Sequence, residues 1–182
     1  KAGKTDRANP RPENRHGHIL ELVPPEAGGL PDHGALEHAW DVFLLAGDPR
    51  AGVGARYPNP PSEHGWLSCP DNLTFDPAGN IWIATDGQYE LGFADSLYAA
   101  EVSGRRRGET RHFFNAPAGA EVCGPIFTPD GTTLFLSVQH PGDGKGTSFA
   151  APATRWPDFS DALPPRSAVV AITKKGGGEV GS

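Results

Sequence analysis

The sequence predicts an all-β fold, a partial β-propeller of about two four-stranded blades plus one extra strand. The 182 residues include 24 glycines and 19 prolines, with short apolar runs between them. This composition favours short strands joined by turns over helices. A strand-like segment also occurs three times, and a hairpin-like segment occurs twice between its copies. Each interval between copies therefore holds four strands, the size of a propeller blade.

The segment that occurs three times is rich in alternating apolar side chains. Its copies are residues 17–23 (GHILELV), 96–102 (SLYAAEV) and 167–173 (SAVVAIT), with a period of roughly 75 residues. The first interval adds the strand-like residues 40–46 (WDVFLLA), and the second adds residues 111–115 (RHFFN). A hairpin completes each interval.

The two hairpins share one plan. In residues 69–87 (CPDNLTFDPAGNIWIATDG), apolar residues alternate on both sides of the turn sequence DPAGN, as expected for a β-hairpin. Residues 121–142 (EVCGPIFTPDGTTLFLSVQHPG) repeat the pattern around TPDG. We therefore interpret the two hairpins as copies of an internal repeat.

Polar residues lie at the open end of each hairpin. A first turn centred between residues 78 and 79 places Asp71 opposite Asp86, and a second turn centred between residues 130 and 131 places Glu121 opposite His140. Two carboxylates at cross-strand distance repel unless a cation lies between them. Asn72 adds a neutral oxygen, and such oxygen ligands suit calcium, magnesium or another hard metal. One hairpin alone fits turn caps or ion pairs equally well, but the repetition favours a shared site.

The order of these patterns divides the chain into four segments. Residues 1–15 are polar, contain proline and lack periodicity, which predicts an extended or disordered lead-in. Residues 16–95 form the first expected blade unit, and residues 96–142 form the second. Residues 143–182 form a loop and the final strand of an incomplete blade.

The charge and hydropathy of the chain argue against two classes of partner. The formal net charge of −6 disfavours nucleic acid, which attracts basic surfaces. The single basic run, Arg105-Arg106-Arg107, is expected to be a solvated hairpin tip, with an anion site as the alternative. No stretch reaches the roughly 20 apolar residues of a membrane-spanning helix. No signal-peptide pattern opens this chain.

Two cysteines, Cys69 and Cys123, lie in equivalent regions of the two hairpins. Neither belongs to a spacing typical of zinc sites. We expect free, buried thiols, because neighbouring propeller blades rarely bring equivalent positions within roughly 7 Å of each other. A disulfide is the alternative in an exported protein.

Three stretches resemble the closing part of the PhoX-type secreted alkaline phosphatases, a family of large β-propeller metalloenzymes. They are residues 9–22 (NPRPENRHGHILEL) and the two hairpin motifs, and they occur in the family's order. The resemblance implies hydrolysis of phosphate monoesters with calcium and iron as cofactors, in a periplasmic or extracellular location. Asp71, Asp86 and Glu121 match metal-binding carboxylates of the family, while Asn72 and His140 are candidate metal or phosphate contacts.

The chain is much shorter than members of that family, so the resemblance implies a C-terminal fragment. The family's site also uses residues of earlier blades, including a cysteine ligand of iron, and we therefore expect this chain alone to be inactive. Uncovered strand edges predict self-association. Two other classes fit the residues. One is a calcium-dependent propeller lactonase of the gluconolactonase type, whose sequences are similar to PDNLTFDPAGNIWIA, and the other is a non-enzymatic propeller scaffold.

Overall fold

The computed structural model describes residues 3–182 and confirms an all-β chain. Lys1 and Ala2 of the expected lead-in lie outside the described residues. The elements are β1 (His18–Val23), β2 (Glu26–Ala27), β3 (Leu30–Pro31), β4 (Ala39–Leu45), β5 (Pro70–Phe75), β6 (Ile81–Thr85), the 3-10 helix η1 (Gln88–Leu91), β7 (Ser96–Ala100), β8 (Arg111–Asn115), β9 (Glu121–Phe127), β10 (Thr133–Gln139) and β11 (Ala168–Thr173). Among residues 3–182, no helix has the length and apolar character needed to cross a membrane.

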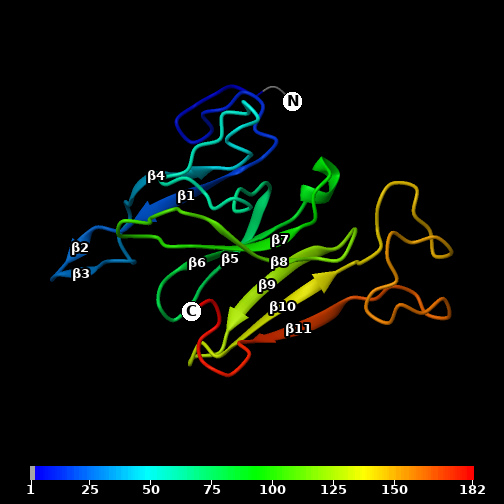
Figure 1. Cartoon of the computed structure of the whole chain (residues 1–182). Coiled ribbons are helices and arrows are strands. Elements are labelled where there is room, and N and C mark those ends of the chain that lie inside the picture. Colours follow the sequence, from blue (N-terminus) through cyan, green and yellow to red (C-terminus); the bar gives the residue numbers. More distant parts are fainter. Residues whose placement is uncertain (1–2) are drawn as a thin grey trace.

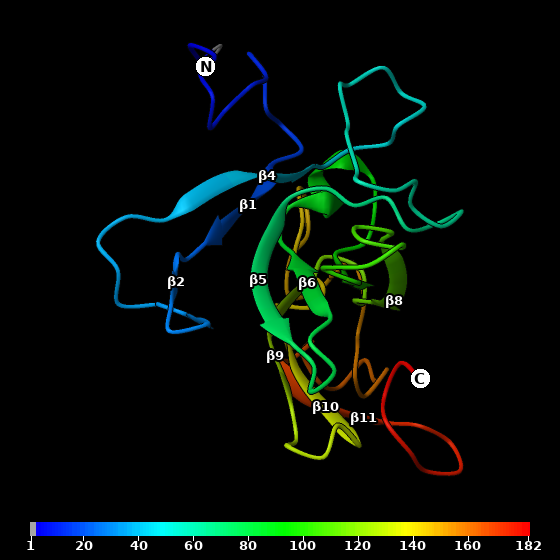
Figure 2. The same ribbon diagram turned by 90° about the vertical axis from the view of Figure 1, so that its left-hand side faces the viewer.

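Three antiparallel sheets are arranged in series. A two-stranded sheet pairs β1 with β4, a four-stranded sheet has the order β5-β6-β7-β8, and a three-stranded sheet has the order β11-β10-β9. A small hairpin of β2 and β3 stands apart from them. Figures 1 and 2 show the β1–β4 sheet at one end of the molecule, the β5–β8 sheet in the middle and the β9–β11 sheet at the other end.

The sheets group the strands in a different phase from the expected repeat units. The strand that occurs three times in the sequence corresponds to β1, β7 and β11. Within the sheets, β7 follows the hairpin β5–β6, and β11 follows the hairpin β9–β10. The middle sheet and the β9–β11 sheet thus each contain a hairpin together with the strand that comes after it, as is usual for strands joined by short connections. The four-stranded sheet consequently crosses the boundary expected between residues 95 and 96.

The hydrophobic core lies on both faces of the middle sheet. Along β6, Trp82 and Ala84 belong to a cluster with residues of β9 and β10, whereas Ile81 and Ile83 belong to a second cluster with residues of β1 and β4. Successive side chains of a strand point to opposite faces. All five residues of β6 are therefore buried, which explains why this strand reads as a continuous apolar run.

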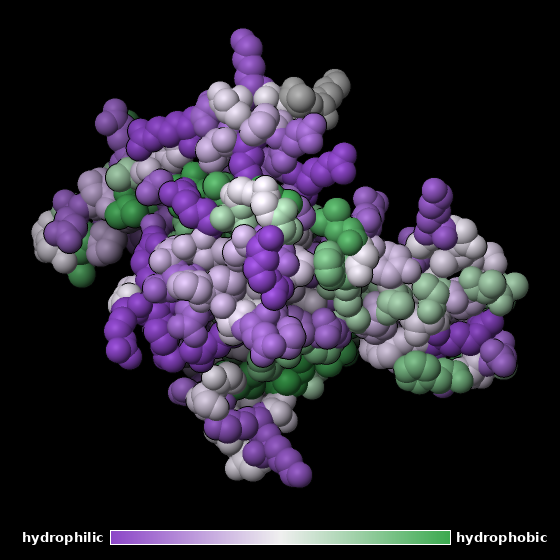
Figure 3. All heavy atoms as spheres, turned by 45° about the horizontal axis from the view of Figure 1, so that its top comes forward, coloured by the Kyte–Doolittle hydropathy of each residue, from purple (hydrophilic) through white to green (hydrophobic). Residues whose placement is uncertain are grey.

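The outer faces of the two flanking sheets are more exposed. Leu22 of β1 is 65% exposed, and Val169 of β11 is 70% exposed. In the view of Figure 3 the surface is largely hydrophilic, and its hydrophobic side chains form separate patches. The middle sheet is thus covered on both faces by this chain, whereas each flanking sheet is covered on one.

The lead-in before β1 is fastened by Arg11. Residues 3–17 contain no helix or strand, but the Arg11 side chain is buried. Its Nη1 donates to the Ala46 carbonyl at 2.7 Å, and its Nη2 donates to the Gly17 carbonyl at 2.6 Å. These bonds hold the lead-in against the end of β4.

Candidate functional site

The first hairpin pairs one residue out of the expected register. Thr74 pairs with Trp82, so the turn is centred on Ala78 rather than between residues 78 and 79. The Asp76 carboxylate closes this turn by accepting hydrogen bonds from the Asn80 backbone N–H at 2.9 Å and from Trp82 Nε1 at 3.0 Å. A side chain that bonds its own turn favours one register over another.

Asp71 and Asp86 are consequently not a cross-strand pair, contrary to the expectation from the sequence. The ladder is irregular after Pro70, which pairs with Thr85. The Asp86 backbone N–H donates to the Cys69 carbonyl at 3.1 Å, beyond the last pair of the ladder. The two carboxylates still lie at the open end of the hairpin, since Asp71 is the second residue of β5 and Asp86 directly follows β6.

The second hairpin keeps the expected register only next to its turn. Phe127 pairs with Leu134 as predicted, but a β-bulge shifts the pairing by one residue farther along. Glu121 therefore pairs with Gln139 instead of His140. His140 nevertheless reaches the carboxylate, since its Nε2 lies 3.4 Å from Glu121 Oε2. The structure thus brings this predicted pair together through side chains rather than through the ladder.

Both oxygens of the Glu121 carboxylate have protein partners. The side chain is 10% exposed. Cys123 Sγ donates to Oε1 at 2.7 Å, and the Gln139 amide donates to Oε2. Burial, together with the hydrogen bond and charge of Glu121, raises the pKa of Cys123 to about 12, so the thiol keeps its proton at neutral pH. Cys69 and Cys123 are both free and half-buried.

The carboxylates of the two hairpins repel one another. Asp86 is exposed at the surface, but partial desolvation by the surrounding protein raises its pKa, the charges of Glu121, Asp95 and Asp71 raise it further, and His140 lowers it. These contributions come from both sheets, since Glu121 belongs to β9 and the other acidic residues belong to the middle sheet or its loops. Repulsion that raises a carboxyl pKa is the condition that a bound cation relieves.

Asp95 is a part of this region that the sequence analysis did not single out. It is 3% exposed, and its Oδ1 accepts hydrogen bonds from the Gln88 N–H at 2.8 Å and from Thr85 Oγ1 at 3.0 Å. Its Oδ2 accepts a hydrogen bond from the Gly87 N–H at 3.1 Å. Asp95 therefore holds the loop that carries Asp86. An aspartate just before a strand is too common in loops to have identified this role.

The backbone is distorted at the open ends of both hairpins. Within residues 3–182, the non-glycine residues with positive φ are Cys69 (51°), His140 (39°) and Phe159 (50°). Cys69 immediately precedes β5, and His140 immediately follows β10. Left-handed conformations are unfavourable for such residues and cluster at functional sites. Their positions mark the same region as the carboxylates do.

A cavity of about 630 Å³ borders this region. Such a volume is within the range of small-molecule sites. Lys145 contributes a cation to a lining that is otherwise rich in carboxylates. The lining residues are Asp86, Gly87, Tyr89, Glu90, Asp95, Gly119, His140, Asp143, Gly144 and Lys145.

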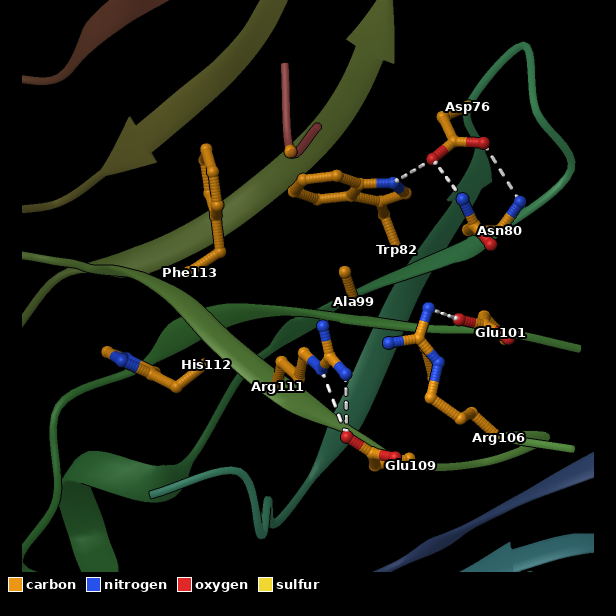
Figure 4. Close-up of a pocket in the computed structure, with 12 residues that line it drawn as sticks. Asp76, Asn80, Trp82, Ala99, Glu101, Arg106, Glu109, Arg111, His112 and Phe113 are labelled. Atoms are coloured by element: carbon orange, nitrogen blue, oxygen red, sulfur yellow. Dashed lines mark hydrogen bonds and ion pairs between the residues drawn. The ribbon is translucent and has the colours of Figure 1, made fainter. Parts of the chain in front are cut away.

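A second cavity, of about 310 Å³, lies at the closed end of the first hairpin, as Figure 4 shows. Two arginines line it, and both are paired. Arg106 forms an ion pair with Glu101, and Arg111 Nη2 lies 2.7 Å from Glu109 Oε1. Because glutamates compensate these guanidinium charges, the lining does not favour an anion, and this cavity is remote from the carboxylates at the open end.

The oxygen-bearing side chains at the open ends are of the type that binds a hard metal, but they do not form a complete metal site. Asp71, Asp86 and Glu121 provide carboxylate oxygens, which calcium and similar ions prefer. Within the described part of the chain, however, no three His, Cys, Asp or Glu side chains lie close enough together to hold one ion. The described side chains thus offer the donor type that a hard metal prefers without gathering into one cluster.

Sheets packed in series, two of which carry a repeated hairpin with an acidic open end, define a portion of a propeller-type protein. The chain belongs to the PhoX alkaline phosphatase family, because residues 1–142 match the family described as alkaline phosphatase PhoX. Its structure is similar to that of Pseudomonas fluorescens PhoX in complex with vanadate, a transition state analogue, with a TM-score of 0.78 and 35% sequence identity. The match covers 96% of this chain and 29% of that chain. No curated protein matches the chain. The predicted family and the propeller-type fold class are thus confirmed.

Proposed function

We propose that this chain is the C-terminal portion of a metal-dependent phosphatase that hydrolyses phosphate monoesters. Membership of the PhoX family supports this proposal, as does the similarity to a structure that holds a transition state analogue. The observation that carries it is electrostatic. Partial desolvation and the charges of Glu121, Asp95 and Asp71 raise the pKa of Asp86, and a bound cation would relieve that repulsion.

In this proposal Asp71, Asp86 and Glu121 would hold the metal, with calcium and iron as the ions that the family resemblance implies. Bound metal ions hold phosphoryl oxygens and neutralise the charge that develops during hydrolysis. His140, which lies 3.4 Å from Glu121, faces the same cavity as Asp86 and is a candidate contact to the phosphate. Lys145 lines the same cavity and is the cation best placed to attract an anionic substrate.

The whole protein would supply what this portion lacks. The chain spans 29% of the length of the PhoX chain that it matches, and no complete set of three ligands exists within residues 3–182. We therefore propose that further ligands come from outside this portion and that the portion alone is inactive. A periplasmic or extracellular location follows from the family resemblance. Exposed apolar residues on the flanking sheets, such as Leu22 and Val169, favour self-association of the isolated portion.

Calcium titration by isothermal calorimetry tests this proposal on the full-length protein and its Asp71→Asn variant. We expect the parent to bind calcium and the variant to bind it much more weakly, since one carboxylate ligand becomes a neutral amide. Asp32→Asn is the matched control, because Asp32 only caps a loop by accepting from the Gly34 N–H at 3.0 Å. Equal calcium affinity in the parent and in Asp71→Asn would contradict the assignment of Asp71.

Hydrolysis of p-nitrophenyl phosphate provides the second readout. The full-length protein should hydrolyse it in the presence of metal, and the isolated 182-residue chain should not. Metal-stimulated hydrolysis by the isolated chain would refute the view that it is only one side of the site. Lactone hydrolysis without phosphatase activity in the full-length protein would instead favour the lactonase alternative, and neither activity would favour the scaffold.

A further inference from the structure

The side chain of Asn72 connects the two hairpins. Its Oδ1 accepts a hydrogen bond from the Gly124 backbone N–H at 2.8 Å, and its Nδ2 donates to Asp71 Oδ2 at 2.7 Å. The backbone N–H of Gly124 is only a donor, so the amide oxygen of Asn72 must face it. The amide NH₂ is thereby turned toward the Asp71 carboxylate. One side chain thus joins β5 to β9 and orients a candidate ligand.

Asn72 and Gly124 occupy equivalent positions of the internal repeat, 52 residues apart, and each lies in a β-bulge. Residues 71–72 of β5 stand opposite a single residue of β6, and residues 124–125 of β9 stand opposite a single residue of β10. A bulge takes a residue out of the ladder and redirects its polar groups. Gly124 adopts a φ of 53°, which suits glycine and lets its N–H point at Asn72.

We propose that Asn72 is a positioning residue that sets the separation of the Asp71 carboxylate on one sheet from the Glu121 carboxylate on the next. Its Nδ2 is only a donor and cannot ligate a metal, and its neutral Oδ1 faces the Gly124 N–H, so the role of Asn72 is to orient Asp71. The strands that it joins, β5 and β9, pack side by side. This inference rests on the proposed function, because the metal site is what the two carboxylates would build.

The chain offers a matched control in Asn80, at the other end of the same hairpin. Asn80 Nδ2 donates to Asp76 Oδ2 at 2.9 Å, as Figure 4 shows. Asn72→Ala and Asn80→Ala each remove an Asn–Asp hydrogen bond from this hairpin. The bond of Asn72 lies at the open end of the hairpin, and that of Asn80 lies at the closed end. A general loss of hairpin stability should affect both variants, whereas a loss of positioning should affect only Asn72→Ala.

Two measurements on the full-length protein test the proposal. The first is hydrogen exchange of the Gly124 amide without metal, which should be faster in Asn72→Ala than in the parent and unchanged in Asn80→Ala. The second is calcium titration by calorimetry. Loss of an outer-shell partner typically weakens metal affinity about 10- to 100-fold, and we expect a decrease of this size for Asn72→Ala and none for Asn80→Ala.

Each other outcome overturns the inference in a recognisable way. Unchanged calcium affinity in Asn72→Ala, with a parent that binds calcium, refutes the positioning role and leaves the proposed function intact. Weaker affinity with unchanged exchange of the Gly124 amide assigns Asn72 to direct ligation instead. Equal weakening by Asn80→Ala shows a general effect of stability. A parent that binds no calcium refutes the proposed metal site and this inference together.

Discussion

Replacement of Asp95 by asparagine tests how the loop that carries Asp86 is held. The Asp95 carboxylate uses both oxygens, because Oδ1 accepts from the Gln88 N–H and from Thr85 Oγ1, whereas Oδ2 accepts from the Gly87 N–H. The asparagine carbonyl can keep the two donors of Oδ1. Its NH₂ group then faces the Gly87 N–H, so that two donors meet and one hydrogen bond is lost.

The expected cost follows from that single lost bond. A hydrogen bond to a charged group contributes about 1.5–3 kcal/mol, and the side chain of Asp95 is 3% exposed, so solvent does little to replace it. We expect Asp95→Asn to lower the free energy of unfolding by about 2–3 kcal/mol. Urea denaturation at pH 7 without metal measures this change. Removal of the negative charge should also lower the pKa of Asp86, because Asp95 helps to raise it, and carboxyl NMR titration measures that shift.

Asp130→Asn is the control for this prediction. Asp130 also accepts several hydrogen bonds, from Thr128 Oγ1 at 2.6 Å and from the backbone N–H and side-chain hydroxyl of Thr132 at 3.1 and 2.9 Å. All of them fall on its Oδ1, which an asparagine carbonyl can replace, so the stability of this variant should change little. An Asp95→Asn variant as stable as the parent, or an equal loss in Asp130→Asn, would refute the reasoning.

Two further predictions concern the acidic groups at the open ends. The pKa of Asp86 in the folded chain is raised by partial desolvation and by neighbouring carboxylates, so the folded state binds this proton more tightly than the unfolded state does. The resulting contribution to the free energy of unfolding is fully present below the unfolded pKa of about 3.9, and it is lost as the pH rises through the folded pKa. Asp86→Asn should therefore stabilise the metal-free chain at pH 7 and not at pH 3. Thermal unfolding of parent and variant at both pH values measures this, and an equal change in stability at the two pH values would contradict the prediction. Glu121→Gln should lower the pKa of Cys123, which burial and Glu121 raise to about 12. Alkylation of Cys123 by iodoacetamide at pH 8, followed by mass spectrometry, should therefore be faster in this variant. An unchanged rate would show that Glu121 does not raise the pKa of the thiol.

The strands of this protein could be predicted closely from the sequence. The strand expected at residues 111–115 is β8 (Arg111–Asn115), and the third copy of the recurring strand is β11 (Ala168–Thr173). Alternation of apolar and polar side chains is a local property, so it locates strands without knowledge of their partners. The same alternation revealed the repeated hairpins and placed polar residues at their open ends.

The grouping of strands into sheets was less accessible. A repeat shows that units recur but not where each unit begins, since any starting point gives the same period. The units expected from the sequence run from one recurring strand to the next, whereas the β5–β8 and β9–β11 sheets each contain a hairpin and the strand that follows it. Hydrogen bonding between consecutive strands decides the phase, and periodicity does not report it.

By itself, then, the sequence determined the all-β class, the strand positions, the family and the carboxylates that gather at the open ends. Only the tertiary structure decided how those carboxylates are held. The Asp76 carboxylate closes the first turn one residue away from the expected centre, and two bulges redirect the strands that carry Asp71 and Glu121. Asp95 holds the loop that carries Asp86, and Asn72 links β5 to β9, each through side-chain hydrogen bonds. These features depend on single polar contacts between residues distant along the chain or outside the ladder, and such contacts leave no periodic signal in a sequence.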